Sequence, residues 1–178
     1  IQAIAAPGTT PSWPSSTVRV WALNKITDVK GNYLTVSYDE DTTNGVYRPA
    51  RIDYAGNATA GTPTHSSVRF NYVALANPIP KFQAGAIIKL VSTLSDVSVY
   101  HGETTLVSKT KLTFQSTGAT QTPRLSTVQQ CDGATSCLPA LNVAYVAGGD
   151  GFSATATTWP NSPRYQTSAG YEPGSVWV

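Results

Sequence analysis

Short stretches of alternating apolar and polar residues run along most of this chain, and residues that favour turns separate them. Between residues 18 and 57, breaks at Gly31, Gly45 and Gly56 divide runs that are rich in Val, Ile, Thr and Tyr. Those side chains suit a pleated surface, and glycine accepts the positive φ of tight turns. No span has the period of about 3.6 residues that marks an amphipathic helix. The pattern predicts a β-meander.

The alternation continues beyond residue 57. Val68 and Phe70 share one side of a run whose other side carries Arg69, and two long runs joined at His101 predict a hairpin. Strands are expected at 17–26, 33–39, 47–54, 67–73, 86–100, 103–115, 124–130 and 141–146, with a loop at 77–80. We predict an all-β protein with little or no helix: an antiparallel meander of roughly eight to ten strands that forms a sandwich or a sheet block.

Composition divides the chain into three parts. A Pro/Ser-rich irregular arm is expected at 1–16, an antiparallel β domain at 17–147, and an irregular segment rich in Gly, Pro and aromatic residues at 148–178. The 178 residues suit one domain or one compact block of a longer chain. Because the chain begins with Ile1 and contains no Met, we expect a segment excised from a longer polypeptide.

Charge and hydropathy exclude several classes of protein. Apolar residues make up 40% and charged residues only 12%, which argues against disorder. The net charge is +2 without a run of basic residues, so nucleic acid is not an expected partner. No apolar run approaches the roughly 20 residues of a membrane helix.

Several blocks occur in an order that resembles a known family. These blocks are Trp-Ala-Leu at 21–23, Gly-Asn-Tyr at 31–33, Tyr-Asp at 38–39, Tyr-x-Pro-x-x-Ile-x-Tyr at 47–54, PKFQAG at 80–85 and CDGATSCLP at 131–139. Over roughly residues 15 to 160 they are similar to the SpvB-type region of large secreted bacterial proteins. That group includes the Rhs (YD-repeat) proteins and the B component of insecticidal toxin complexes, and the last block resembles the element that precedes an FG-GAP β-propeller.

The resemblance implies a non-catalytic structural module of a secreted or cell-surface bacterial protein, a wall segment that encloses or presents a separate effector. Its partners would be the remainder of a parent chain or another toxin-complex subunit. Enzymatic activity would lie in a different domain, and this chain contains no Glu-x-Glu pair. Open sheet edges could also pair two copies of the chain.

Cys131 and Cys137 are the only cysteines. They could form a disulfide across a short loop, remain inert thiols, or bind a metal, although two thiolates need further ligands. A disulfide would point to secretion.

Two sets of polar residues could carry chemistry. Asp39, Glu40 and Asp41 could supply oxygen ligands for Ca²⁺, or form a solvated hairpin loop. The two histidines, His65 and His101, fall in turns, where solvated side chains are expected in preference to a general base. No other cofactor is implied.

Aromatic residues mark the last part of the chain. Trp159, Tyr165, Tyr171 and Trp177 could stack on sugar rings, pack within this domain, or pack on a missing neighbour. The first of these alternatives defines a second class of function, an extracellular carbohydrate-binding, lectin-like module assisted by calcium.

Overall fold

The computed structural model describes residues 2–5, 18–83, 86–116 and 122–145, all within the compact unit Ile1–Val146. These residues form ten strands in two sheets and contain no helix. The strands are β1 (Gln2–Ala5), β2 (Val18–Ala22), β3 (Lys25–Thr27), β4 (Asn32–Asp41), β5 (Val46–Asn57), β6 (Ser66–Gln83), β7 (Ala86–His101), β8 (Thr105–Ser116), β9 (Pro123–Asp132) and β10 (Leu141–Asn142).

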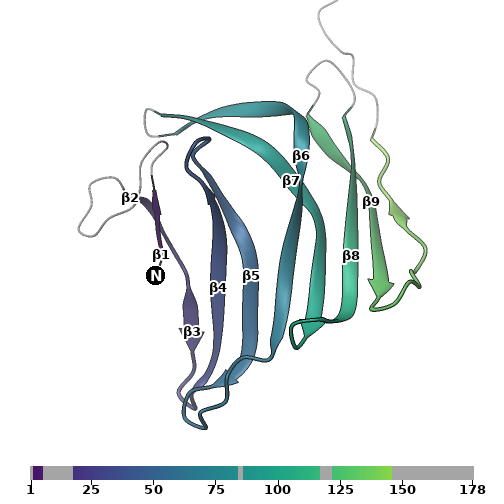
Figure 1. Ribbon diagram of the computed structural model, residues 1–178. Helices are drawn as coiled ribbons and strands as arrows, with labels where there is room; N and C mark the ends of the chain where they lie inside the picture. The colour runs from purple at the N-terminus through teal and green to yellow at the C-terminus, as the bar shows by residue number, and fades with distance from the viewer. Residues whose placement is uncertain (1, 6–17, 84–85, 117–121, 146–178) are drawn as a thin grey trace, which may run out of the picture. The chain divides into compact units, whose positions relative to one another are not determined.

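Strands β3 to β10 form one eight-stranded antiparallel sheet in which every strand lies beside its neighbours in sequence (Figure 1). Tight turns join β3 to β4, β4 to β5 and β7 to β8, where Gly31, Gly45 and Gly102 have positive φ values of 84°, 67° and 62°. The prediction of an all-β antiparallel meander is confirmed. Of the two expected forms, the described residues adopt the open sheet block.

Some expected boundaries differ from the structure. The loop predicted at 77–80 is wrong, because these residues lie inside β6. Pro78 and Pro80 lack the N–H group that a regular ladder needs, and the β6–β7 register shifts between Ala74 and Ile79. The prolines therefore disturb the pairing of this strand without ending it.

The first expected strand is in fact two strands with different partners. β2 pairs with β1 in a separate two-stranded sheet, whereas β3 pairs with β4. β1 itself lies within the arm that was predicted to be irregular. At the other end, β10 is shorter than the run predicted at 141–146.

The upper parts of β6 and β7 bend over the hairpin that joins β4 to β5 (Figure 1). The Lys89 amide donates to the Asn44 carbonyl at 2.9 Å, and Arg48 donates to the Ser92 hydroxyl. Arg19 on β2 also reaches the Gln83 side chain and the Gly45 carbonyl, at 2.8 and 2.6 Å. These contacts hold the bend against the first strands of the sheet.

The strand register separates apolar from polar side chains, because residues directly opposite each other share a face. We call one side of the sheet the apolar face. Its members are Leu34, Val36, Ile52, Tyr54, Val68, Phe70, Val97, Val99, Leu112, Phe114, Leu125 and Val128. The opposite side, the polar face, carries Arg51, Asp53, Ser67, Arg69, Asn71, Asp96, Ser98, Lys109, Lys111 and Gln129.

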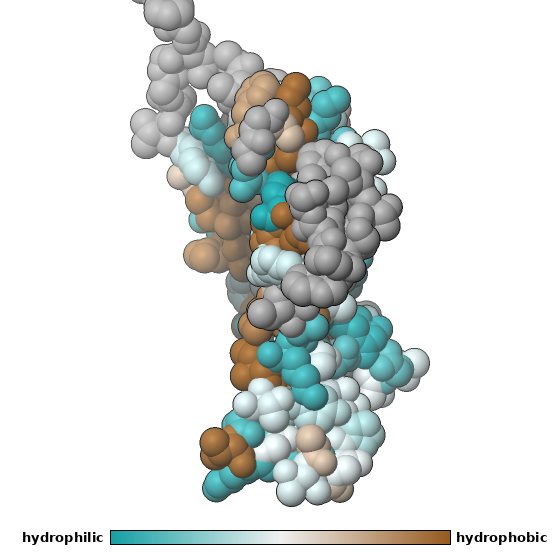
Figure 2. All heavy atoms as spheres, turned by 90° about the vertical axis from the view of Figure 1, so that its left-hand side faces the viewer, coloured by the Kyte–Doolittle hydropathy of each residue, from teal (hydrophilic) through white to brown (hydrophobic). Residues whose placement is uncertain are grey.

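The apolar face is not covered by a second layer of described residues, since every one of its members is partly exposed. Of the fully buried side chains among the described residues, Ser67 and Ser98 lie on the polar face, and Ile4 lies on β1 in the separate two-stranded sheet. Only Ile4, Ala22 and Cys131 are buried apolar residues among those described. In Figure 2, which views the sheet from its β3 side, hydrophobic and hydrophilic atoms gather on opposite sides where grey atoms do not hide them.

Candidate functional site

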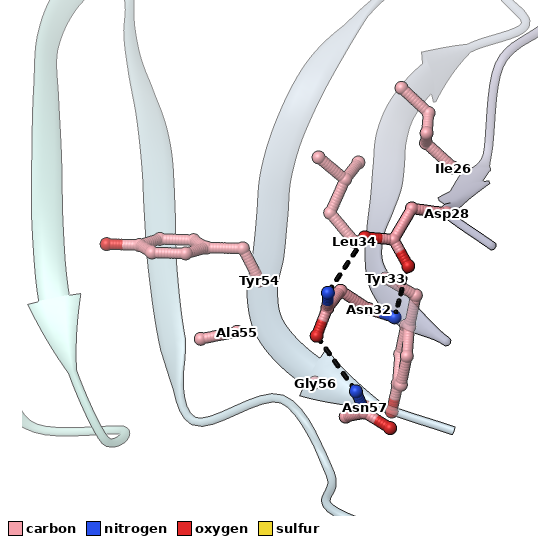
Figure 3. A pocket seen from close by; sticks show the side chains of 9 residues that line it. All are labelled: Ile26, Asp28, Asn32, Tyr33, Leu34, Tyr54, Ala55, Gly56 and Asn57. Carbon is pink, nitrogen blue, oxygen red and sulfur yellow. Dashed lines mark hydrogen bonds between the residues drawn. The ribbon is translucent and has the colours of Figure 1, made fainter. Parts of the chain in front are cut away.

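A hollow in the described part of the chain lies where β3, β4 and β5 meet their turns (Figure 3). Its volume is about 490 Å³. Ile26 and Leu34, which pair across β3 and β4, form its apolar wall together with Tyr54. Ile26 is 50% exposed, so the hollow opens to solvent beside the edge of the sheet.

A hydrogen-bonded network forms the polar side of this hollow. Asp28 accepts from the Lys30 and Asn32 amides and from the Asn32 side chain, each at 2.8 Å. The Asn32 oxygen in turn accepts from the Asn57 side chain at 2.8 Å. Hydrogen bonding from Asn32 lowers the pKa of Asp28 below its ordinary value. Because these groups satisfy one another, the network mainly fixes the turn between β3 and β4.

Close packing of Tyr33 on glycine completes the site. A Cβ atom at Gly56 would lie 2.6 Å from a carbon of the Tyr33 ring, so only glycine fits beneath that ring. The Lys25 ammonium lies 4.5 Å from the centroid of the same ring and makes a cation–π contact with it. The neighbouring residue, Ala55, has a φ of 64°, which is rare for alanine. The arrangement can accept a small apolar group, but its lining residues include no nucleophile paired with a base.

On the polar face, Glu103 connects three parts of the sheet. Its carboxylate accepts two hydrogen bonds from Arg51, at 2.6 and 2.9 Å, and one from Arg69 at 2.9 Å. Arg51 also pairs with Asp53 at 2.6 Å, and Arg69 lies 4.1 Å from the centroid of the Tyr100 ring. Hydrogen bonding from Arg51 lowers the pKa of Glu103. The cluster ties the β7–β8 turn to β5 and β6.

A second cluster surrounds Asp96. Its carboxylate accepts from the Asn71 side chain and the Ser98 hydroxyl, both at 2.7 Å, and lies 3.7 Å from the Lys109 ammonium. Burial by itself would raise the pKa of Asp96, but these hydrogen bonds and the Lys109 charge outweigh it, and the pKa is lowered. Both clusters are internally satisfied, as expected of groups that stabilise a sheet.

These lowered pKa values predict that the chain is less stable in acid. A carboxylate whose folded pKa lies below its unfolded value stabilises the fold above the unfolded pKa, about 4, and loses this contribution as the pH falls through the folded pKa. We therefore expect the free energy of unfolding, measured with urea, to be nearly constant from about pH 7 to 5 and to fall below about pH 4. Asp96→Asn should make the free energy of unfolding fall less steeply below about pH 4, whereas Thr93→Val on the same strand should leave the pH dependence unchanged. A stability that stays level down to pH 3 would contradict the prediction.

The residues proposed for calcium do not converge. Asp39 lies opposite Arg48, with its Oδ2 atom 3.6 Å from the Arg48 Nε atom, and both carboxylate oxygens of Asp41 accept hydrogen bonds from Asn44. Because side chains alternate along a strand, Glu40 lies on the face of β4 opposite to that of Asp39 and Asp41. The described residues contain no group of three or more His, Cys, Asp or Glu that could hold a metal ion. Calcium binding stays a prediction without support from this geometry.

The two cysteines form a disulfide in the structure. Their Cα atoms are 3.9 Å apart, and the two residues face each other in an isolated antiparallel bridge. Cys131 is buried and Cys137 is exposed.

The aromatic residues proposed for sugar binding, Trp159, Tyr165, Tyr171 and Trp177, lie outside the described residues, so that alternative also stays a prediction.

Sequence reasoning treated His65 and His101 as separate turn residues, but the fold brings them together. Their ring centroids lie 5.8 Å apart. The Glu103 cluster was likewise missed, because its two arginines are 18 positions apart in sequence and meet only through the register that places Arg51 opposite Arg69.

Comparison with known proteins identifies the fold. No family model matches the sequence, and no curated protein matches it. Two solved structures share the arrangement of strands. In the crystal structure of TcdB2-TccC3-Cdc42, the matching chain is 18% identical, with a TM-score of 0.60, and the match covers 80% of this chain and 9% of that one. In the N-terminal domain of effector protein SpvB from Salmonella typhimurium strain LT2, the identity is 17%, the TM-score 0.51, and the covered shares 81% and 55%.

The described residues therefore define the class as an open antiparallel sheet whose fold matches parts of these two solved structures. This chain shares that fold, in agreement with the resemblance seen in the sequence. It spans only 9% and 55% of the two matched chains. Among the described residues there is no helix that is long and apolar enough to cross a membrane.

Proposed function

We propose that this chain is a non-catalytic structural module of a large, secreted, toxin-like bacterial protein, in which its sheet contributes to a shell or scaffold for a separate effector. The observation that carries the proposal is the apolar face, which extends over six strands, from β4 to β9, without cover from any described residue. The shared fold with SpvB and the TcdB2-TccC3 assembly supports the same role.

A bare apolar face is unusual for a domain of this size. Stable domains pack each sheet against a second layer, and hydrophobic burial is the main favourable term in folding. Here the described residues bury only three apolar side chains. The proposal assigns the second layer to another part of the parent polypeptide or to a neighbouring subunit. The polar face needs no such partner, because its charged clusters satisfy themselves.

The mass of the native gene product tests this proposal directly. An immunoblot of source cells and medium, with an antibody against this chain, should show a product several times heavier than 18.8 kDa, part of it in the medium. A single product of 18.8 kDa would overturn the assignment to a larger protein.

Exposure of the apolar face can be tested separately with the dye ANS, which binds exposed hydrophobic surface. The isolated chain should bind ANS, and the longer natural polypeptide should bind much less per chain. Val68→Thr and Val97→Thr, which place hydroxyl groups on the apolar face, should reduce dye binding, whereas Thr35→Ser on the other side should not. Equal dye binding by the isolated chain and the longer polypeptide would show that no second layer covers this face.

A further inference from the structure

His65 and His101 are the only histidines in the chain, and they lie 36 positions apart in sequence. His65 precedes β6, and His101 ends β7. Their imidazole rings are 5.8 Å apart between centroids and nearly perpendicular, with an interplanar angle of 83°. Both side chains are exposed. Nothing in the structural role of the sheet requires two imidazoles at this position.

The backbone around the pair is held firmly. The Gly102 amide donates to the His65 carbonyl at 2.7 Å, and the His65 amide donates to the Tyr54 carbonyl at 3.3 Å. In the β6–β7 ladder, Ser66 lies directly opposite His101. The sheet therefore fixes the backbone that carries the two imidazoles before any ligand arrives, which lowers the entropy cost of binding.

We propose that this histidine pair is a surface chelate for a divalent transition-metal ion that favours imidazole, Zn²⁺ or Cu²⁺. Zinc–nitrogen bonds of about 2.0–2.1 Å at a tetrahedral ion place the centroids of two bound imidazoles roughly 5 Å apart. The observed 5.8 Å separation is close to this value, and small rotations of two exposed side chains can supply the difference. Imidazole nitrogen suits both ions, with copper bound more tightly than zinc.

The two imidazoles leave the remaining coordination positions to water. Glu103 is near in sequence, but Arg51 and Arg69 already occupy its carboxylate. The site should discriminate against Mg²⁺ and Ca²⁺, which require oxygen ligands. Because the metal binds neutral imidazole, acidification should release it.

Binding would join the loop before β6 to the β7–β8 turn. A ligand that binds only the folded chain raises its stability by mass action, so excess Zn²⁺ should raise the melting temperature. The chain has no other histidine, and its two cysteines are joined in a disulfide. A histidine-dependent signal can therefore come only from this pair, provided that the protein carries no histidine tag.

The experiment uses the full 178-residue chain without a tag, titrated with ZnCl₂ and CuCl₂ by calorimetry and thermal melting. Wild type and Thr104→Asn, a neighbouring exposed control, should bind both ions and show a raised melting temperature. His65→Asn and His101→Asn should each lose most of the affinity and of the shift, and MgCl₂ should have no effect on any form. For wild type, electron paramagnetic resonance of bound Cu²⁺ should show two nitrogen ligands.

Several results would overturn the proposal: no binding of either ion by wild type, wild-type affinity in both histidine variants, or a copper spectrum without nitrogen coupling. The spectrum needs no variant, so it remains decisive if a substitution impairs folding. These outcomes are independent of whether the chain belongs to a shell.

Discussion

Gly133→Ala should destabilise the chain by about 2 kcal/mol, because no side chain fits between the disulfide loop and β8. A Cβ atom at Gly133 would lie 2.8 Å from the carbonyl carbon of Leu106 and closer still to its oxygen. The obstacle is backbone, which cannot rotate away as a flexible side chain can. Relief requires the loop to move from β8, against the disulfide and the hydrogen bonds of Asp132. Urea unfolding followed by circular dichroism measures the loss.

The comparison variant is Gly61→Ala. Gly61 has a φ of 67° but nothing within 4 Å of an added Cβ atom, so its replacement tests the cost of backbone conformation alone, about 1 kcal/mol. Gly133→Ala should cost clearly more than this. If the two variants lose equal stability, the contact between the loop and β8 is looser than the structure indicates.

Local pattern was sufficient to predict most strands of this fold. Alternation such as Val68, Arg69 and Phe70 reports which side chains share a face, and glycine reports where the chain reverses, so β4, β5 and β7 appear near their expected places. The prediction was wrong at 77–80, because two prolines normally indicate a loop. Here β6 pairs with β7 between and beyond these prolines, at Ile79 and Lys81. Long-range pairing overrode the local signal.

Whether the sheet is open could not be predicted from alternation. An apolar row such as Ile52, Val68 and Val97 appears the same in sequence whether a second sheet covers it or not. The histidine pair and the Glu103 cluster were hidden for a related reason. Their members are far apart in sequence, and only the register of β5, β6 and β7 makes them neighbours. Sequence reasoning found residue types with chemical potential, whereas the pairing of strands decides which of them meet.

Removal of the disulfide, by Cys131→Ser together with Cys137→Ser, should also lower stability by about 2 kcal/mol. The two cysteines are six positions apart, and closing such a loop removes about 2 kcal/mol of chain entropy from the unfolded state in the chain-entropy account. Burial of Cys131 adds to the loss. Asp132 limits this loss of stability, because its side chain keeps the loop folded. It accepts hydrogen bonds from the Ala134 and Ser136 amides at 2.9 and 3.1 Å.

The same loss should follow from reduction of the wild-type chain. Melting with and without dithiothreitol should therefore differ for wild type and coincide for the double serine variant, which controls for other effects of the reductant. Coincident melting curves for oxidised and reduced wild type would show that Asp132 alone organises the loop.

The disulfide and Gly133 both act on the loop between Cys131 and Cys137, so the stability losses from their removal should not add. Once the disulfide is absent, the loop can shift from β8, and Gly133→Ala should then cost less than it does in the oxidised chain.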